Sequence, residues 1–283
     1  MKNIKIAGVP EHFNLPWHLC IEDGSFKQNG LDVNWTDFPD GTGAMCKALR
    51  NKEVDVAVIL TEGIIKDILN GNDAKIVQEY IASPLVWGIH VAADSEYKEI
   101  QDLKNAKVAI SRYGSGSHLM AYVNAKNLGW NPEELEFEVV GDIDGAVAAL
   151  KEGRAGYFMW EHFTTKPMVD KGIFRRVADC PTPWSCFVIA ARKEFLEQES
   201  AAVYTMLKSL NVVTKKFKNI PGIETALAKK YDQKQEDIEQ WLKITEWSQK
   251  QLSVGEVEKV QEQLKELNLI SETKENSYFL SNL

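Results

Sequence analysis

Apolar residues occur along the chain in short alternating or continuous runs, and each run is followed by a stretch with helical spacing. Three such pairs of strand and helix open the chain, at residues 4–9 and 17–22, 31–38 and 44–51, and 54–60 and 64–69. Strands that alternate with helices are typical of sheets built from right-handed crossovers. We therefore expect an α/β fold with parallel-type sheets and flanking helices.

The pattern then begins again, as an internal repeat. Residues 5–8 match residues 107–110, and residues 48–58 match residues 149–159 at a nearly equal offset. Two similar α/β lobes explain this match more economically than a chance resemblance of short apolar runs.

The repeat and the helical end of the chain predict how the lobes are divided. From residue 195 onward the pattern is helical, with expected helices at 201–217, from Pro221, at 235–251 and at 257–267. We expect these helices to pack on the first lobe. That lobe then comprises residues 1–91 and 188–283, the second comprises residues 92–187, and a hinge of short strands near 88–92 and 186–191 joins them.

A glycine-rich turn offers the first candidate site. Residues 107–110 form an apolar strand, and a helix is expected from residue 119, so residues 111–118 lie on a strand-to-helix turn. Glycine lets the backbone pass close to a ligand, and a helix start presents free N–H groups. The predicted ligand-binding residues of this turn are Ser115, Gly116, Ser117 and His118. The alternative is a permissive loop without a ligand.

Other candidates lie where strands of a parallel sheet end, since ligands gather beyond their carboxyl ends. They are His12, Phe13, Thr42, Gly43, Thr61, Glu62, Trp160, Glu161, His162 and Trp184. Thr42 and Gly43 could equally serve only to cap a helix. Trp160 and Trp184 could stack on a planar or apolar part of a ligand. The carboxylates Glu62 and Glu161 disfavour a doubly charged anion and favour an amine, an aminopyrimidine or a zwitterion.

Two catalytic or metal-binding alternatives are weaker. His12, His118 and His162 fall on predicted site loops and could hold zinc, but none is paired at helical i, i+4 spacing. Ser117, His118 and Glu161 could be imagined as a triad, but neighbours at a helix start do not face each other. We therefore expect no catalysis, no metal and no cofactor.

Charge and cysteine usage exclude further classes. The formal net charge of −8 disfavours an extended nucleic-acid surface, and no apolar run reaches the roughly 20 residues of a membrane span. The four cysteines include no CxxC pair. The N-terminus enters a strand at once, without a secretory signal. We expect a cytoplasmic location if Met1 is the native start, and a periplasmic or cell-surface location if a signal was removed.

Several segments together resemble a known family. They are Phe26 with Gly30–Val33, Gly41–Gly43 followed by Val54–Ala57, Asp102–Lys104 before Val108, and Trp160-Glu161 after an Ala-Leu-Lys-Glu-Gly run. Their order resembles the two-lobed type II periplasmic-binding-protein fold, in the group that binds nitrate, sulfonates, taurine and thiamine pyrimidines. Three features depart from that pattern: Gly156 in place of Asp, His162 in place of Pro, and the missing export signal.

The resemblance implies a monomeric solute-binding protein whose lobes close on a polar or anionic organic solute, such as a sulfonate, a taurine-like zwitterion or an aminopyrimidine. Its further partner would be the membrane subunit of an ABC-type importer. The alternative is a cytosolic homologue that acts as a sensor or as an enzyme of thiamine-pyrimidine synthesis. The enzyme of that group consumes its own histidine and uses pyridoxal phosphate, and its cysteine-rich motif has no counterpart here.

Overall fold

The computed structural model describes residues 1–281, and the chain divides into two compact units. The first unit comprises Met1–Pro84 and the chain from Trp184 onward, and the second comprises Leu85–Pro183. The chain therefore passes between the units at residues 84–85 and 183–184. The crossings expected from the sequence, at residues 91–92 and 187–188, lie a few residues further along, because the whole of β5 (Val86–Ala92) pairs within the second unit.

The first unit is built on a five-stranded sheet in the order β2-β1-β3-β10-β4. Its strands are β1 Lys2–Gly8, β2 Leu31–Asp37, β3 Val56–Leu60, β4 Ala74–Ile81 and β10 Phe187–Arg192. β1 is parallel to both β2 and β3, as the sequence predicts. The sheet is nevertheless mixed, because β10 returns from the second unit and inserts antiparallel between β3 and β4.

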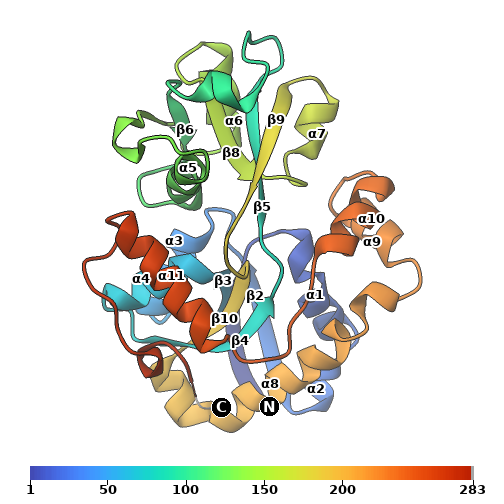
Figure 1. The fold of residues 1–283 in the computed structure, drawn as a ribbon. Helices are drawn as coiled ribbons and strands as arrows, with labels where there is room; N and C mark the ends of the chain where they lie inside the picture. Colours follow the sequence, from blue (N-terminus) through green and yellow to red (C-terminus); the bar gives the residue numbers. More distant parts are fainter. Residues whose placement is uncertain (282–283) are drawn as a thin grey trace. The chain divides into compact units, whose positions relative to one another are not determined.

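Groups of helices pack around this sheet, among them the pair α9 and α10 (Figure 1). The helices of the unit are α1 Leu15–Glu22, α2 Ser25–Gln28, α3 Thr42–Arg50, α4 Thr61–Leu69, α8 Lys193–Thr214, α9 Ile223–Lys230, α10 Gln235–Ile244 and α11 Val254–Glu266. The helices α1, α2 and α8 pack together, and α4 packs against α3 and α11. The helical end of the chain, with α8 and α11, thus packs in the first unit.

The helix expected over residues 235–251 ends at Ile244, and this prediction was wrong in its second half. The segment after Ile244 runs along the outer edge of β4, where the N–H groups of Glu79 and Ala82 donate to the carbonyls of Lys250 and Glu246. An edge strand leaves such groups unpaired. The extended segment therefore satisfies hydrogen bonds that a longer helix would leave exposed.

The second unit repeats this plan with the sheet order β7-β6-β8-β5-β9. Its further elements are β6 Val108–Ile110, β7 Phe137–Val139, β8 Tyr157–Glu161, β9 Phe174–Pro181, α5 Gly116–Asn127, α6 Ile143–Lys151 and α7 Lys166–Asp170. Ala109, Ala146, Leu150, Phe158 and Phe174 are buried in its core. Each unit thus has a sheet and a hydrophobic core of its own.

Strand register confirms the internal repeat residue by residue. In the first unit Ile6 lies opposite Val56, and in the second Val108 lies opposite Tyr157. These are the pairs that the alignment of residues 5–8 and 48–58 with 107–110 and 149–159 requires. The antiparallel strand also recurs, since β10 lies beside β3 as β5 lies beside β8.

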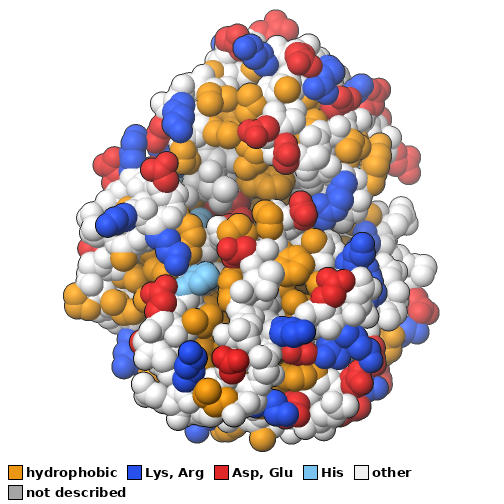
Figure 2. All heavy atoms as spheres, turned by 180° about the vertical axis from the view of Figure 1, so that it is seen from behind, with side chains coloured by type: hydrophobic (Ala, Val, Ile, Leu, Met, Phe, Trp, Pro, Cys, Tyr) orange, Lys and Arg blue, Asp and Glu red, His pale blue; other side chains and the backbone are white. Residues whose placement is uncertain are grey.

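The charged side chains form no patch of a single sign on the face that Figure 2 shows, where blue and red groups are intermixed. Within residues 1–281, no helix is both long and apolar enough to span a bilayer.

Candidate ligand-binding site

In the first unit, two candidate segments meet where β3 ends and α4 begins. Thr42 starts α3, and Gly41 before it has φ +71°, a conformation that favours glycine. A Cβ on Gly63 would lie 2.3 Å from Cγ2 of Thr42, so the first turns of α3 and α4 touch at this glycine. Thr61, expected in a loop, lies in the first turn of α4, and its hydroxyl donates to the Cys186 carbonyl at 3.2 Å.

Glu62 is a buried carboxyl group in this first turn. It is 3% exposed, and Nε1 of Trp184 donates to its Oε2 at 2.8 Å. Burial raises the pKa of Glu62 from 4.5 to about 7, although hydrogen bonds from its own backbone and from Trp184 oppose the shift. No Lys, Arg or His side chain among residues 1–281 forms an ion pair with this carboxylate. A cation supplied from outside the chain would therefore lower its cost of ionisation.

His12 and Phe13 lie in a short 3-10 turn (His12–Asn14), where the sequence predicted an open loop. Tyr80 fixes the turn, because its hydroxyl donates to the Phe13 carbonyl at 2.8 Å. The His12 ring stacks on Phe13 and meets Trp241 edge-on at 4.3 Å between ring centroids. Burial lowers the pKa of His12 to about 3, so this imidazole is neutral at physiological pH. Its Nε2 is buried and has no hydrogen-bond partner in residues 1–281.

In the second unit, the glycine-rich turn opens α5 as predicted, but its hydroxyls bond to one another. Oγ of Ser117 accepts from the Ser111 N–H at 3.0 Å and lies 3.0 Å from Oγ of Ser115. Ser115 is the N-cap of α5 and accepts from the His118 N–H, while Nδ1 of His118 accepts from the Gly114 N–H at 3.1 Å. Gly116 is the first residue of the helix. These contacts hold the turn in one shape, with Ser117 buried inside it.

The Ser117→Ala variant should lose about 1–3 kcal/mol of stability, since it leaves the buried Ser111 N–H without its acceptor. The sequence predicts a ligand-binding role for Ser117, and the hydrogen bond from Ser111 adds a structural one. Urea unfolding measures the loss. Ser253→Ala, which removes a helix cap from α11 in the first unit, is the reference and should cost about 1 kcal/mol. Equal stability of Ser117→Ala and the unmodified chain would mean that the hydroxyl does not hold the turn.

The end of β8 places three further candidates in the second unit. Glu161 is buried and accepts from the Thr164 N–H at 2.6 Å, and burial raises its pKa. Trp160 is half-buried and stacks on Phe158 with ring centroids 5.3 Å apart. His162 lies 2.8 Å from Asp179 through its Nδ1, and its carbonyl accepts from Arg176 at 2.8 Å. The His162 side chain thus already has partners on β9.

The structure divides the predicted site residues between the units. The first unit holds His12, Phe13, Thr42, Gly43, Thr61, Glu62 and Trp184, and the second holds Ser115, Gly116, Ser117, His118, Trp160, Glu161 and His162. Trp184, expected to stack on a ligand from a loop, is buried and donates to Glu62 instead of lying free. The sequence missed Trp241 and Tyr231 beside His12, and Asp179 and Arg176 beside His162. Only an alignment that pairs distant positions could have indicated these contacts.

Metal binding has no support from side-chain clusters in the described chain. In residues 1–281, no group of three or more His, Cys, Asp or Glu is placed to hold an ion. His118 is enclosed by the rings of Tyr113, Tyr122 and Phe137. All four cysteines are buried thiols that take no part in a disulfide bond.

Known proteins match this architecture. Residues 87–180 match the family described as Ca3427-like periplasmic-binding proteins. Over the whole chain, the structure superposes on the Candida albicans CA3427 gene product with a TM-score of 0.88 at 25% identity, covering 97% of this chain and 92% of that one. That protein is described as defining a new family with the generic periplasmic-binding-protein fold. The chain has the type II periplasmic-binding-protein fold.

Two further solved structures share this fold at lower identity. The alkanesulfonate-binding protein SsuA from Xanthomonas axonopodis pv. citri, bound to MOPS, gives a TM-score of 0.80 at 14% identity, with 96% of this chain and 95% of that one covered. The ligand-binding component of an ABC-type import system from Staphylococcus aureus gives 0.76 at 15% identity, covering 99% and 97%. No curated protein matches the sequence. The periplasmic-binding-protein fold suggests that the chain binds a small-molecule solute.

Proposed function

We propose that the protein is a solute-binding protein without catalytic activity, whose two units close on a small organic solute. The solute carries an amine or aminopyrimidine group, alone or together with a sulfonate as in a taurine-like zwitterion. A further part of the proposal is that the loaded protein delivers the solute to the membrane subunit of an ABC-type importer. The ABC-type import component and the alkanesulfonate-binding protein among the proteins of this fold support the transport part.

Glu62 is the observation that carries the choice of solute. Its carboxyl group is buried at the start of α4, its pKa is raised to about 7, and Trp184 is a neutral partner. A bare anion at this position would be repelled by the ionised carboxylate and would add to the free-energy cost of ionising it. An ammonium or a protonated aminopyrimidine would instead offset the loss of hydration that raises the pKa.

The test is a ligand screen on the full chain. Thermal-shift measurements followed by calorimetry should cover alkanesulfonates, amino-sulfonates and aminopyrimidines, and small-angle scattering should report whether binding makes the protein more compact. The proposal expects a saturable binder that carries an amine and a decrease in the radius of gyration. A screen without binders, or tight binding of sulfonates regardless of an amine, would contradict it.

The affinity for the amine-bearing solute should rise about tenfold between pH 6 and pH 8. A carboxyl group with a pKa of about 7 is roughly one-tenth ionised at pH 6 and nine-tenths ionised at pH 8, and only the ionised form pairs with the cation. Calorimetry in two buffers of different ionisation enthalpy should also detect proton release near pH 6. The Glu62→Gln variant is the control, and its affinity should not follow this pH dependence.

A further inference from the structure

An ion pair between Asp55 and Arg192 lies at the edge of the first unit's sheet where β1 and β3 begin. The Asp55 carboxylate accepts from the Lys5 N–H at 2.9 Å and from the Arg192 guanidinium at 2.6 Å. Both side chains of the ion pair are 14% exposed. The backbone beside it is paired as well, because the Asp55 N–H donates to the Lys5 carbonyl.

The second unit has the same backbone but lacks both charged side chains. The Gly156 N–H donates to the Lys107 carbonyl at 2.8 Å, as Asp55 does to Lys5. Strand register places Ala92 where the first unit has Arg192. In the first unit Ala190 lies opposite Ala57. In the second unit His90 lies opposite Phe158, which corresponds to Ala57, so Ala92 corresponds to Arg192. The Lys107 N–H therefore has no carboxylate at position 156 to donate to.

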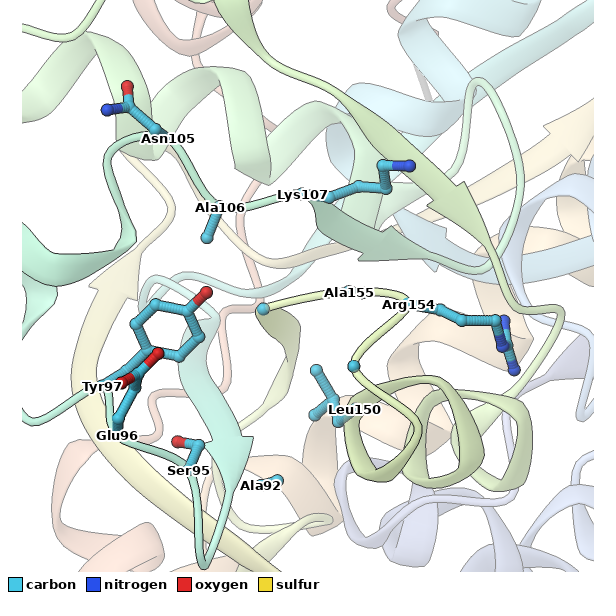
Figure 3. A pocket seen from close by; sticks show the side chains of 12 residues that line it. Ala92, Ser95, Glu96, Tyr97, Asn105, Ala106, Lys107, Leu150, Arg154 and Ala155 are labelled. Carbon is cyan, nitrogen blue, oxygen red and sulfur yellow. The ribbon is translucent and has the colours of Figure 1, made fainter.

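A pocket of about 520 Å³ occupies this place in the second unit (Figure 3). Its walls include Ala92, Tyr97, Ala106, Lys107, Leu150 and Gly156. In Figure 3 the Tyr97 hydroxyl points into the pocket, whereas the charged ends of Lys107 and Arg154 point away from it. We call it the second-unit pocket. It lies where β6 and β8 begin, at the opposite edge of the sheet from Ser115 and Glu161.

Gly156 packs tightly against two residues of the pocket wall, Ala106 and Tyr97. A Cβ on Gly156 would lie 2.5 Å from the Cβ of Ala106 and 3.3 Å from the Tyr97 ring, so a larger residue cannot enter without displacing them. Arg175 fixes the segment that carries Tyr97, because its guanidinium donates to the carbonyls of Ser95 and Tyr97 at 3.1 and 2.5 Å. The pocket is therefore built from groups that are held in place.

We propose that the second-unit pocket binds a small organic carboxylate. Its carboxylate oxygens would act as the acceptor that the Asp55 side chain provides in the first unit, accepting from the Lys107 N–H and from the Tyr97 hydroxyl. Leu150, Ala92 and Ala106 would contact an alkyl or aryl part of the ligand. This site is separate from the solute site around Glu62 and does not depend on it.

Nuclear magnetic resonance on the ¹⁵N-labelled full chain tests the proposal with matched probes. Butyrate should shift the amide signals of Lys107 and Gly156 saturably, with a Kd on the order of 1–10 mM for so small a ligand. Butyramide has the same shape without the charge and should bind at least about tenfold more weakly. Tyr97→Phe should weaken butyrate binding about tenfold, and Leu150→Trp should abolish it by filling the pocket.

Two further variants separate the outcomes. Glu62→Gln should leave butyrate binding unchanged, because Glu62 lies in the first unit and the pocket in the second. The butyrate result therefore does not depend on whether the proposed solute site is correct. Asp55→Gly removes the carboxylate from the first unit but keeps Arg192, and its lowered melting temperature should recover partly in butyrate but not in butyramide. Equal shifts with both probes, or butyrate binding that Tyr97→Phe and Leu150→Trp leave unchanged, would overturn the proposal.

Discussion

Replacing Glu62 by glutamine should stabilise the protein more at high pH than at low pH. The gain in the free energy of unfolding should be about 3 kcal/mol larger at pH 8 than at pH 4.5. The folded carboxyl has a pKa of about 7, and its ordinary value is 4.5. As the pH rises from 4.5 to 7, the unfolded chain loses this proton while the folded chain keeps it. Stability therefore falls across that window and levels off above it, by about 1.4 kcal/mol for each unit of pKa difference. A glutamine at position 62 has no proton to lose.

Urea unfolding of both proteins between pH 4.5 and pH 8 measures this difference. Trp184→Phe is the matched control, because it removes the N–H that stabilises the ionised carboxylate and should extend the loss of stability to higher pH. Parallel pH profiles for the unmodified chain and Glu62→Gln would show that Glu62 ionises in the folded state as readily as in the unfolded one.

The Phe158→Ala variant should destabilise the second unit by about 3–5 kcal/mol and leave the first unit folded. Phe158 is fully buried among Ala109, Leu150 and Phe174 and supports the ring of Trp160. Removing a buried aromatic ring costs this much when the surrounding core cannot collapse into the space. Because the units have separate cores, the effect should be confined to residues 85–183.

Native-state hydrogen exchange resolves this result by segment. Amides of residues 85–183 should lose protection together in Phe158→Ala, while those of β1 and β3 keep theirs. The matched variant Phe26→Ala removes a buried ring beside Trp17 in the first unit and should give the opposite pattern. Uniform loss of protection across the whole chain in both variants would indicate a single cooperative unit.

The sequence predicted several strands of both units because they are continuous apolar runs, as in residues 56–60 and 187–191. It also predicted the repeat, whose register the two sheets confirm at Ile6–Val56 and Val108–Tyr157. The direction of β10 could not be predicted from local pattern. Its apolar residues suit a parallel or an antiparallel neighbour, and only the path of the chain through the second unit decides between them.

The candidate site was predicted less completely, since side-chain partners come from distant segments. Nothing local to Ser117 indicates that its hydroxyl accepts from Ser111, and nothing near His12 indicates Trp241. The first turn of α4 is not evident from local pattern, because Thr61 and Gly63 are poor helix formers. Contact between Gly63 and Thr42 explains the glycine there, since a side chain would separate the two helix starts.

Glu62 is the residue on which the proposed choice of solute rests. From the sequence, a carboxylate at a strand end disfavoured a bare anion as the solute. In the structure, the same group is buried beside Trp184 without a cation from the described chain. The repeat leads to a second carboxylate argument that does not depend on Glu62. In the first unit the Lys5 N–H donates to the Asp55 carboxylate, whereas Gly156 leaves the Lys107 N–H without such a partner.

The most direct measurement of the central claim is a calorimetric titration at pH 8 with matched solutes that differ only in the amine. Taurine and isethionate form one such pair, and an aminopyrimidine and its hydroxypyrimidine form another. We expect the amine-bearing member of at least one pair to bind, and Glu62→Gln to weaken that binding about 100-fold, as expected for loss of a buried charge partner. Equal affinity for both members of each pair, or an unchanged affinity in Glu62→Gln, would contradict the assignment.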